Sequence, residues 1–406
     1  MEENEPKTRP RIAFLTALTL QDRRSSWRIT NRYMTEALQK YCGDVVDIGP
    51  IDIPELPLGK AVNKATKLLL KKGYMYYHSF YFAKRYAKLL AKKLEGQPFD
   101  LLFGPSCATE VAFLETDLPV VLTEDAHIGV LLNYYAQFSN LLKRSVYEAN
   151  TLESMGLKKA SLALYPSDWA AHSARDIYGL DAGKVHTVPY GTNIDTPPSP
   201  EVALRRRKSD QCKLFFIGVD WERKGGEIAF ETLLELEKLG INAHLTICGC
   251  VPPPEFRHER LRIIPFLDKK IESQRREMES LFETSDFLFL PTRGDAYGMV
   301  FCEASSFGLP SIATDTGGVS GAVREGENGF LLPPSARGKE YAELIARVYR
   351  DDRLYAALVT SSRAAFEERL NWDAWGQSVA KLIQHMLAGK KGNSPIGIPV
   401  GTAGSV

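Results

Sequence analysis

The sequence predicts an α/β protein built from two doubly wound parallel sheets. Its 406 residues exceed the roughly 250 to 300 residues at which a single hydrophobic core stops growing. Short apolar runs alternate with longer amphipathic stretches, which is typical of parallel strands that are buried on both faces and joined by helices. A segment rich in proline and basic residues near the middle separates two halves of similar pattern. We therefore expect two domains of the same architecture.

The apolar runs give the expected strands in order, and each run ends near Gly, Pro, Asp or Thr. In the first half the runs are residues 12–17, 45–48, 101–104, 119–122, 162–165 and 186–189. In the second half they are residues 214–217, 244–248, 261–265, 287–290, 311–313 and 329–332.

The domain boundary is expected in residues 196–211, which contain three prolines and a basic cluster at residues 205–208. This places the first domain at residues 1–200 and the second at residues 201–370. We expect an exposed connection with a solvated cluster, because no aromatic residues interleave with the basic ones as they would in a nucleic-acid site. Residues 389–406 are rich in Gly, Pro and Ser and are expected to be a disordered tail.

Charge and cysteine content exclude several classes of protein. The 51 basic and 50 acidic residues create no net field that would draw the chain onto nucleic acid. Six scattered cysteines fit a reducing compartment, and the pair Cys248 and Cys250 is too small for a metal site. The polar N-terminus and the lack of a long apolar run argue against a signal peptide or a membrane span. We expect a cytoplasmic protein, at most peripheral to the inner membrane face.

Residues 60–93 have a different composition from the rest of the chain, because Lys and Arg make up nearly a third of them and are mixed with leucines and aromatic residues. The pattern indicates basic amphipathic helices. Two interpretations stay open. The segment is either a crossover with a solvated cationic face, or a surface for an anionic lipid or a charged acceptor.

The segment 289–318 carries the strongest chemical signal, in the order strand, loop, helix, strand and loop. A helix that begins near Gly298 leaves backbone amides unpaired and forms a seat for phosphate. Asp295 and Glu303 flank this seat. Ionised carboxylates accept hydrogen bonds from sugar hydroxyls, so the pattern favours a ligand that carries both phosphate and hydroxyl groups.

This segment resembles the signature of retaining glycosyltransferase family 4, which has the GT-B fold. The matching features are an acid, seven intervening residues and a Glu, followed by Ala, Gly-x-Pro and Gly-Gly. Further matches extend the resemblance over nearly the whole chain: Phe216-Ile-Gly218, Lys224-Gly225, the run from Pro189 to Asp195, and Asn371-Trp372. The resemblance implies two Rossmann-like domains facing a central cleft, with a last helix at residues 371–388 returning to the first domain.

The resemblance also implies an activity and a donor site. A hexose would move from a nucleoside-diphosphate sugar to an acceptor hydroxyl with retention of configuration, with a UDP-sugar favoured and GDP-mannose next. No cofactor and no protein-bound metal are expected. Donor contacts are implied for residues of the second domain: Asp295 with the sugar, Glu303 with the ribose, Gly298, Met299 and Val300 with the distal phosphate or sugar, and Gly218 at the strand end.

Arg223 and Lys224 are expected to contact the donor diphosphate, because the charge of the leaving group must be neutralised without a metal. The alternative is a solvated basic pair at a helix start. The chain departs from the family at two positions. Asp295 stands where Glu is usual, and Val219 stands where an Arg is common, which puts sugar choice and rate in question.

The first domain is expected to hold the acceptor, a sugar, a lipid-linked sugar or a small molecule. Its first strand leads into a polar loop with Ser25, Ser26 and Trp27, placed where open α/β sheets bind ligands. Trp27 would stack on a sugar or belong to the core. Asp125 takes the place of a family histidine and is either catalytic or a helix cap. His127, two residues further on, is a second cleft candidate.

Rival functions are a dinucleotide-dependent oxidoreductase, a sugar-nucleotide epimerase of the same fold and a non-catalytic sugar-nucleotide binder. The oxidoreductase is disfavoured because no Gly-x-Gly-x-x-Gly follows the strand at residue 12 or the strand at residue 214.

Overall fold

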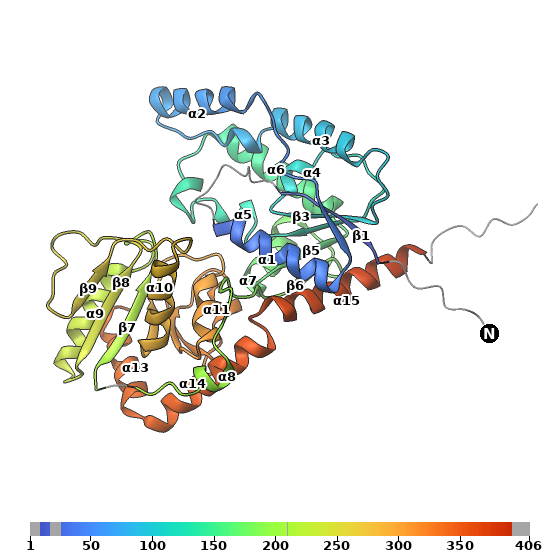
Figure 1. Ribbon diagram of the computed structural model, residues 1–406. Helices are drawn as coiled ribbons and strands as arrows, with labels where there is room; N and C mark the ends of the chain where they lie inside the picture. Colours follow the sequence, from blue (N-terminus) through green and yellow to red (C-terminus); the bar gives the residue numbers. More distant parts are fainter. Residues whose placement is uncertain (1–8, 17–25, 209, 392–406) are drawn as a thin grey trace, which may run out of the picture.

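Two parallel six-stranded sheets form the framework of the protein (Figure 1). The computed structural model describes residues 9–16, 26–208 and 210–391. The first sheet has the order β2-β1-β3-β4-β5-β6 and the second the order β12-β11-β10-β7-β8-β9. The strands of the first sheet are β1 Arg11–Phe14, β2 Asp44–Asp47, β3 Leu101–Pro105, β4 Val120–Thr123, β5 Leu162–Tyr165 and β6 Val185–Thr187. Those of the second are β7 Cys212–Ile217, β8 Ala243–Cys248, β9 Leu261–Ile264, β10 Phe287–Leu290, β11 Ser311–Thr314 and β12 Gly329–Leu332.

Every expected strand is present, and the α/β fold with two doubly wound sheets is confirmed. The central strands β3, β4, β5 and β10 are buried at every position. Burial on both faces explains why these strands read as continuous apolar runs in the sequence.

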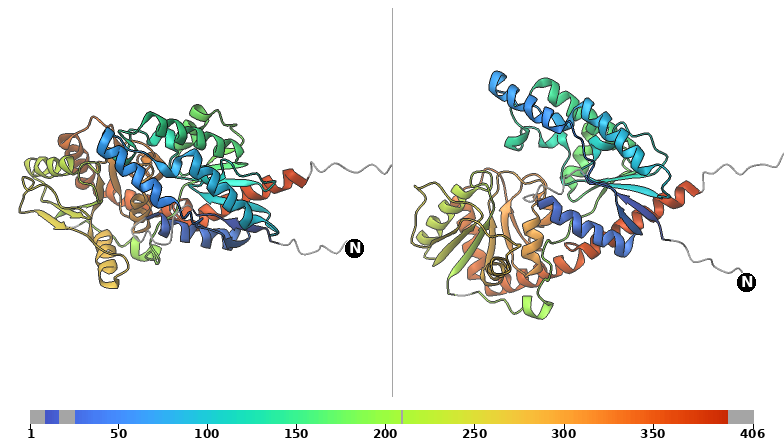
Figure 2. Two further views of the ribbon diagram at one scale, coloured as in Figure 1. Left: turned by 90° about the horizontal axis from the view of Figure 1, so that it is seen from above. Right: turned by 45° about the horizontal axis from the view of Figure 1, so that its top comes forward.

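Helices connect the strands and cover both sheets (Figures 1 and 2). In the first half they are α1 Ser26–Tyr41, α2 Leu56–Leu70, α3 Phe80–Leu94, α4 Ala108–Val111, α5 Ile128–Leu131, α6 Lys143–Lys159 and α7 Asp168–Tyr178, with 3₁₀ turns η1 Tyr76–His78 and η2 Ala136–Phe138. In the second half they are α8 Pro200–Ala203, α9 Gly226–Lys238, α10 Glu272–Thr284, α11 Met299–Ser306, α12 Val319–Ala322, α13 Gly338–Arg350, α14 Asp352–Glu368 and α15 Trp372–Lys391.

Each sheet has one point at which the strand order reverses. In the first sheet this point lies between β1 and β3, and in the second it lies between β10 and β7. The loops after such a pair of strands leave in opposite directions and open a crevice that binds ligands in doubly wound folds. By this rule the second crevice is expected between the loop after β7 and the loop that runs from Pro291 to Gly298.

The last helix, α15, leaves the second domain and packs against the first, as expected (Figure 2). Asn371 caps its start, since its Oδ1 accepts a hydrogen bond from the Ala374 amide at 2.8 Å. Trp372 stacks on Tyr190 and Tyr33, and a Cβ at Gly376 would lie 2.6 Å from the Tyr41 ring. The helix continues to Lys391, beyond the expected end at residue 388, because one glycine costs a helix only about 1 kcal/mol. The rest of the expected tail lies outside the described residues.

The connection between the domains differs from the expectation of a solvated basic cluster. The Arg206 guanidinium donates to the carbonyls of Phe282, Ser285 and Phe307, and its burial lowers the pKa of Arg206. Lys208 donates to the Tyr349 carbonyl. The expectation is wrong for these two residues, because they fasten the connection to the second domain. Arg205 and Arg207 are exposed as expected.

Residues 60–93 contain helices with opposite environments. α3 buries Phe82, Ala83, Tyr86, Ala87 and Leu90. In contrast, Gly59 is the single buried residue of α2, all of whose residues the structure describes. α2 lies along the outer edge of the first domain and projects beyond it (Figure 1). None of the helices within the described part of the chain combines the length and the apolar character needed to cross a bilayer.

Candidate active site

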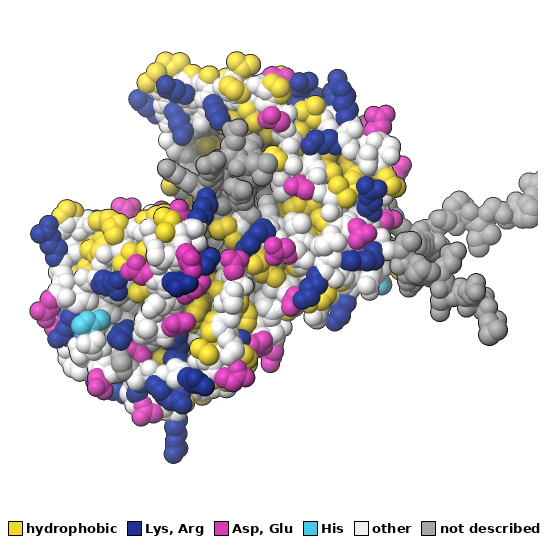
Figure 3. Space-filling model, in the orientation of Figure 1, with side chains coloured by type: hydrophobic (Ala, Val, Ile, Leu, Met, Phe, Trp, Pro, Cys, Tyr) yellow, Lys and Arg dark blue, Asp and Glu magenta, His cyan; other side chains and the backbone are white. Residues whose placement is uncertain are grey.

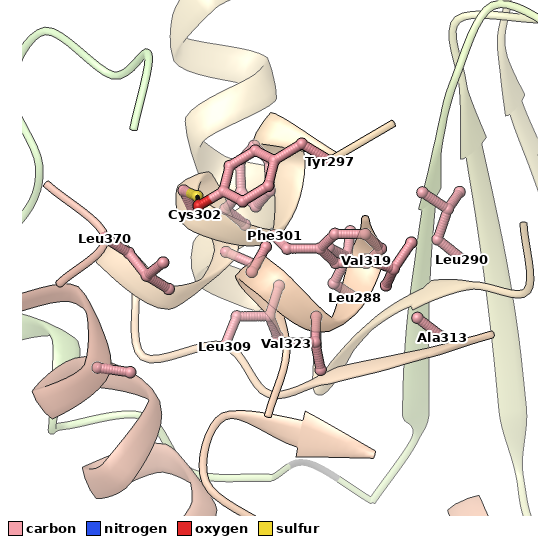
Figure 4. Packing of buried hydrophobic residues seen from close by; sticks show 14 of the residues in the cluster. Leu288, Leu290, Tyr297, Phe301, Cys302, Leu309, Ala313, Val319, Val323 and Leu370 are labelled. Atoms are coloured by element: carbon pink, nitrogen blue, oxygen red, sulfur yellow. Dashed lines mark hydrogen bonds between the residues drawn. The ribbon is translucent and has the colours of Figure 1, made fainter. Parts of the chain in front are cut away.

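The start of α11 matches the expected anion seat. Gly298 precedes the helix with a φ of 87°, and a Cβ there would lie 2.6 Å from the Phe301 ring, so only glycine fits. Gly298, Met299 and Val300 are each partly exposed, and the first amides of a helix have no partner within it. Figure 4 shows the opposite side of α11, where Phe301 and Cys302 pack into the core of the second domain.

Lys224 and Asp295 form a buried ion pair in the crevice between β7 and β10. The Lys224 Nζ lies 2.8 Å from Asp295 Oδ1 and 2.7 Å from Oδ2. Lys224 is only 9% exposed and Asp295 only 6%. The alternative of a solvated basic pair is therefore wrong for Lys224. Its side chain crosses Gly218, where a Cβ would lie 2.6 Å from Lys224 Cγ, so the structure brings Gly218, Lys224 and Asp295 together.

Arg223 adds a second cation to the same crevice. Its Nη1 donates to the Gly294 carbonyl at 2.8 Å and lies 3.4 Å from Asp295 Oδ1. The guanidinium remains partly exposed, unlike the Lys224 ammonium. Val219 occupies the position that the sequence resemblance associates with Arg. It is 73% exposed and carries no charge. Arg223 and Lys224 are therefore the cations that the loop after β7 supplies here.

Glu303 is also buried and also paired with a cation. Its Oε1 accepts from the Lys269 Nζ at 2.7 Å. Lys269 comes from the loop after β9 and lines a cavity of about 410 Å³ between the domains, together with Arg32, Asn193, Asp195 and Arg275 among others. Asp295 and Glu303 thus lie on either side of the α11 start, each held by an ammonium group. Sequence reasoning did not identify Lys269.

The Gly317-Gly318 loop packs directly on the loop that carries Asp295. The Gly318 amide donates to the Asp295 carbonyl at 3.0 Å. A Cβ at Gly317 would lie 2.2 Å from that carbonyl, and one at Gly318 would lie 1.9 Å from the Ala296 carbonyl. These two glycines allow the close approach that fixes the Asp295 loop against the end of β11.

Two tyrosines of the first domain reach across to the Asp295 loop and were missed by sequence reasoning. The Asp295 amide donates to the Tyr134 Oη at 3.0 Å, and the Ala296 amide donates to the Tyr135 Oη at 2.7 Å. The Arg223 guanidinium lies over the Tyr135 ring, 5.2 Å from its centroid. The only sequence signal is an aromatic doublet after a short helix, which is common in ordinary cores. These contacts join the two domains at the candidate site.

Asp125 lies on the first-domain side of the same region. Its Oδ1 accepts from the Ala126 amide at 2.9 Å, but α5 begins at Ile128 with His127 at its N-cap, so the cap interpretation is wrong. Burial, with a smaller contribution from the charge of Asp295, raises the pKa of Asp125 to about 6. The catalytic interpretation of Asp125 remains a prediction.

His127 does not line the cleft, and this expectation is wrong. The side chain is fully buried between the Tyr165 and Tyr178 rings, and Nε2 pairs with the Ser173 hydroxyl at 2.9 Å. Burial lowers the pKa of His127 to about 4. Ser25 lies outside the described residues. Ser26 and Trp27 begin α1, but their side chains are not among those described.

Besides Glu148, which pairs with Arg144, the first domain has three further buried Glu side chains, where no charged site was expected. They are Glu110 on α4, Glu124 after β4 and Glu153 on α6. Burial raises the pKa of Glu110 and of Glu153 to about 7, and the pKa of Glu124 well above its ordinary value. The Tyr165 hydroxyl donates to Glu124 at 3.2 Å. Across residues 9–16, 26–208 and 210–391, no His, Cys, Asp and Glu side chains form a group of three or more that could hold a metal ion.

Comparison with known proteins shows that the chain is similar to glycosyltransferases. Residues 203–365 match the family model of glycosyl transferases group 1. A D-inositol 3-phosphate glycosyltransferase of Xylanimonas cellulosilytica is 27% identical over 48% of this chain and 50% of its own length. One of Corynebacterium jeikeium is 24% identical over 73% of this chain and 75% of its length. The alpha-D-kanosaminyltransferase of Streptomyces kanamyceticus is 23% identical over 59% of this chain and 64% of its length. The chain thus spans about half of the first of these relatives.

Solved structures show the same fold over almost the whole chain. A glycosyltransferase of Rickettsia africae has a TM-score of 0.62 at 15% identity and covers 95% of this chain and 100% of its own. Sucrose-phosphate synthase of Thermosynechococcus elongatus has a TM-score of 0.63 at 17% identity, covering 94% and 100%. Anabaena Alr3699/HepE in complex with UDP and glucose has a TM-score of 0.60 at 15% identity, covering 93% and 100%. The fold is that of the GT-B glycosyltransferases.

Proposed function

We propose that this protein transfers a hexose from a nucleoside-diphosphate sugar to an acceptor hydroxyl with retention of anomeric configuration. The observation that carries the proposal is the buried Lys224–Asp295 pair beside the start of α11, at the point where the strand order of the second sheet reverses. This crevice offers ammonium, guanidinium, backbone amides and carboxylates to one ligand. A diphosphate attached to hydroxyl-bearing rings uses all four kinds of group.

The proposed donor lies along this crevice. The first amides of α11 would bind the distal phosphate, while Arg223 and Lys224 neutralise the charge that develops on the leaving diphosphate. Asp295 would accept hydrogen bonds from the sugar, and Glu303 from the ribose. Lys224 and Lys269 hold these two carboxylates in place before a ligand arrives. A UDP-sugar is favoured, because HepE binds UDP and glucose in the same fold.

The proposed reaction requires little acid–base chemistry from the protein. The bond between the anomeric carbon and the diphosphate oxygen breaks, and a bond to the acceptor oxygen forms on the same face of the sugar. The acceptor proton passes to the leaving phosphate oxygen, so no protein-bound metal is invoked. The protein would orient both substrates and exclude water, with Tyr134 and Tyr135 joining the first domain to the Asp295 loop.

Nucleotide-sugar binding by the full-length protein tests the proposal. A donor present at about 100 times its dissociation constant should stabilise the folded state by about 2.7 kcal/mol, measured as a shift in thermal unfolding. We expect such a shift with a UDP-sugar, a smaller shift or none with other nucleotide sugars, and no shift with the free hexose. As a control, the variant Lys339→Ala removes a lysine whose side chain is 73% exposed, and it should show the same shift as the unaltered protein.

The product of the reaction separates the rival functions. A transferase releases free nucleoside diphosphate and forms a new glycosidic bond, whereas an epimerase returns a nucleotide sugar and a non-catalytic binder returns the donor unchanged. The proposal fails if no nucleotide sugar in a UDP and GDP panel alters the unfolding temperature. The acceptor is proposed to be a sugar, a lipid-linked sugar or a small molecule that meets the first domain near Asp125.

A further inference from the structure

Large apolar side chains are unusually exposed along α2. Leu68 is 68% exposed and Leu69 is 77% exposed, and Leu58, Val62 and Leu70 are each about half exposed or more. Elsewhere among the described residues, exposed large apolar side chains are mostly spread singly or in short loops. Single exposed apolar residues are normal on protein surfaces, but five on one helix indicate a binding surface. The side chains that share this helix identify the partner.

The same helix is strongly cationic. Lys60, Lys64 and Lys67 lie on α2, and Lys71 and Lys72 follow it. The sequence has no Asp or Glu between Glu55 and Glu95. None of these five lysines forms an ion pair with any residue that the structure describes. Their charge is therefore available to an anionic partner, and Figure 3 shows dark-blue and yellow side chains gathered along the helix at the top of the molecule.

Four apolar residues and four lysines occupy opposite faces of α2 and its C-cap, while Leu68 and Leu70 lie between these faces. Leu58, Val62, Ala65 and Leu69 recur at the spacing of one helical face, while Lys60, Lys64, Lys67 and Lys71 recur at the same spacing on the opposite face. A helix with one apolar and one lysine-rich face is the form that lies in the interface of a bilayer. α2 has these two faces without packing the apolar one into the protein core.

A groove beside α2 extends its apolar surface. The cavity has a volume of about 420 Å³ and includes Leu58, Val62, Tyr81, Phe82 and Leu142 among its walls. Arg144, which is paired with Glu148, and Glu55 also line this cavity. The apolar walls match the chemistry of an acyl chain.

We propose that α2 docks the protein onto an anionic lipid bilayer. The apolar face and the adjoining groove enter the interfacial layer, and the lysines bind anionic headgroups. A second copy of the chain is a poor occupant, because two α2 surfaces without any acidic residue would repel each other. A soluble acidic protein would pair with the lysines, but it would not cover the apolar face of α2. The bilayer satisfies both faces at once.

Vesicle sedimentation of the full-length protein tests this proposal without any nucleotide sugar. Vesicles of phosphatidylcholine alone are compared with vesicles containing about 30% phosphatidylglycerol, a composition chosen for a strong negative surface potential. We expect binding to the anionic vesicles, weakening as salt rises, and little binding to the neutral ones. The triple variant K60Q/K64Q/K67Q should bind roughly 100-fold more weakly. The double variant L68S/L69S should bind on the order of tenfold more weakly.

Matched variants separate α2 from general surface effects. The triple variant K158Q/K339Q/K381Q removes the same charge elsewhere, and the double variant I177S/V202S removes exposed apolar side chains elsewhere. Both should bind like the unaltered protein. Because α2 is exposed, all four variants should unfold at nearly the same temperature. Nucleotide-sugar binding, measured separately by thermal shift, should also be unaffected, so this proposal and the proposed function can fail independently.

Three results would overturn the proposal. The first is equal binding to neutral and anionic vesicles or binding to neither. The second is loss of binding in the matched variants as large as in the α2 variants. The third is self-association that depends on Leu68 and Leu69, seen as a larger particle in size-exclusion chromatography, which would assign the surface to a second copy of the chain.

Discussion

The buried carboxyl groups beside α11 differ from three buried glutamates of the first domain, which also holds one buried pair, Glu148 with Arg144. In the second domain, Asp295 is held by Lys224 and Glu303 by Lys269. In the first domain, Glu110, Glu124 and Glu153 have no Lys or Arg at ion-pair distance among the described residues, and burial raises the pKa of each. A buried carboxyl group without a cation is stabilised by keeping its proton, whereas one with a cation keeps its charge.

This difference indicates what each region is built for. Charged pairs at a crevice are ready to exchange partners with a charged ligand, so the second domain is suited to a diphosphate and its sugar. In the first domain, Glu124 accepts a hydrogen bond from the Tyr165 hydroxyl and has no Lys or Arg partner among the described residues. Altering the second-domain set should therefore affect both stability and turnover, whereas altering the first-domain set should affect stability.

The largest expected effect comes from Lys224→Ala. Removing the ammonium leaves Asp295 buried without its closest cation, which should lower the free energy of unfolding by about 3 to 5 kcal/mol. It should also lower turnover by roughly 10² or more, because the diphosphate loses a preorganised charge. Chemical denaturation and steady-state kinetics measure the two effects. The double variant K224M/D295N should recover most of the stability but not the turnover, and recovery of both would deny Lys224 a role in the reaction.

A smaller effect is expected from Glu110→Gln, and it should depend on pH. The pKa of Glu110 is raised by burial to about 7, above its ordinary value of 4.5. The folded state then holds a proton that the unfolded chain loses, so this contribution is complete below about pH 4.5 and is lost as pH rises through about 7. The span is on the order of 3 kcal/mol. Unfolding free energies of the Gln variant should decline less over this range. The variant Glu36→Gln, at an exposed position, should behave like the unaltered protein. If the unfolding free energies of the unaltered protein and of both variants declined equally with pH, the proposed role of buried Glu110 would be wrong.

The smallest of these effects is expected from Tyr135→Phe, which probes the contact between the two regions. The Ala296 amide loses its acceptor, at a cost of about 1 to 3 kcal/mol if the amide stays buried. We expect kcat/KM to fall roughly tenfold. The exposed Tyr147→Phe should leave the kinetics unchanged. Unaltered kcat/KM in Tyr135→Phe would mean that this contact between the domains is absent during the reaction.

The strands and the α11 segment could be predicted because their signals are local. Buried parallel strands appear as continuous apolar runs, and the start of α11 requires a glycine at position 298. Asp295, Lys224 and Glu303 were each identified on this basis. The cation partner of Glu303 was not predicted, because Lys269 lies 34 residues before Glu303 and belongs to no motif in the sequence.

The remaining features depend on contacts between distant parts of the chain. Tyr134 and Tyr135 reach a loop 161 residues away, and an aromatic doublet does not indicate that reach. Arg206 was expected to be solvated with its neighbours, yet three carbonyl groups of the second domain surround it. α2 and α3 both mix basic with apolar residues, and tertiary packing decides which of them buries its apolar face.

The return of α15 to the first domain has a mechanical consequence. The polypeptide passes between the two lobes twice, once near residues 196–211 and once at the start of α15, so the hinge consists of two parallel tethers. Two tethers permit bending about the line that joins them but resist twisting. For the same reason, a protease that cuts at the exposed Arg207 would leave both fragments bound to each other through the aromatic stack of Tyr33, Trp372 and Tyr190.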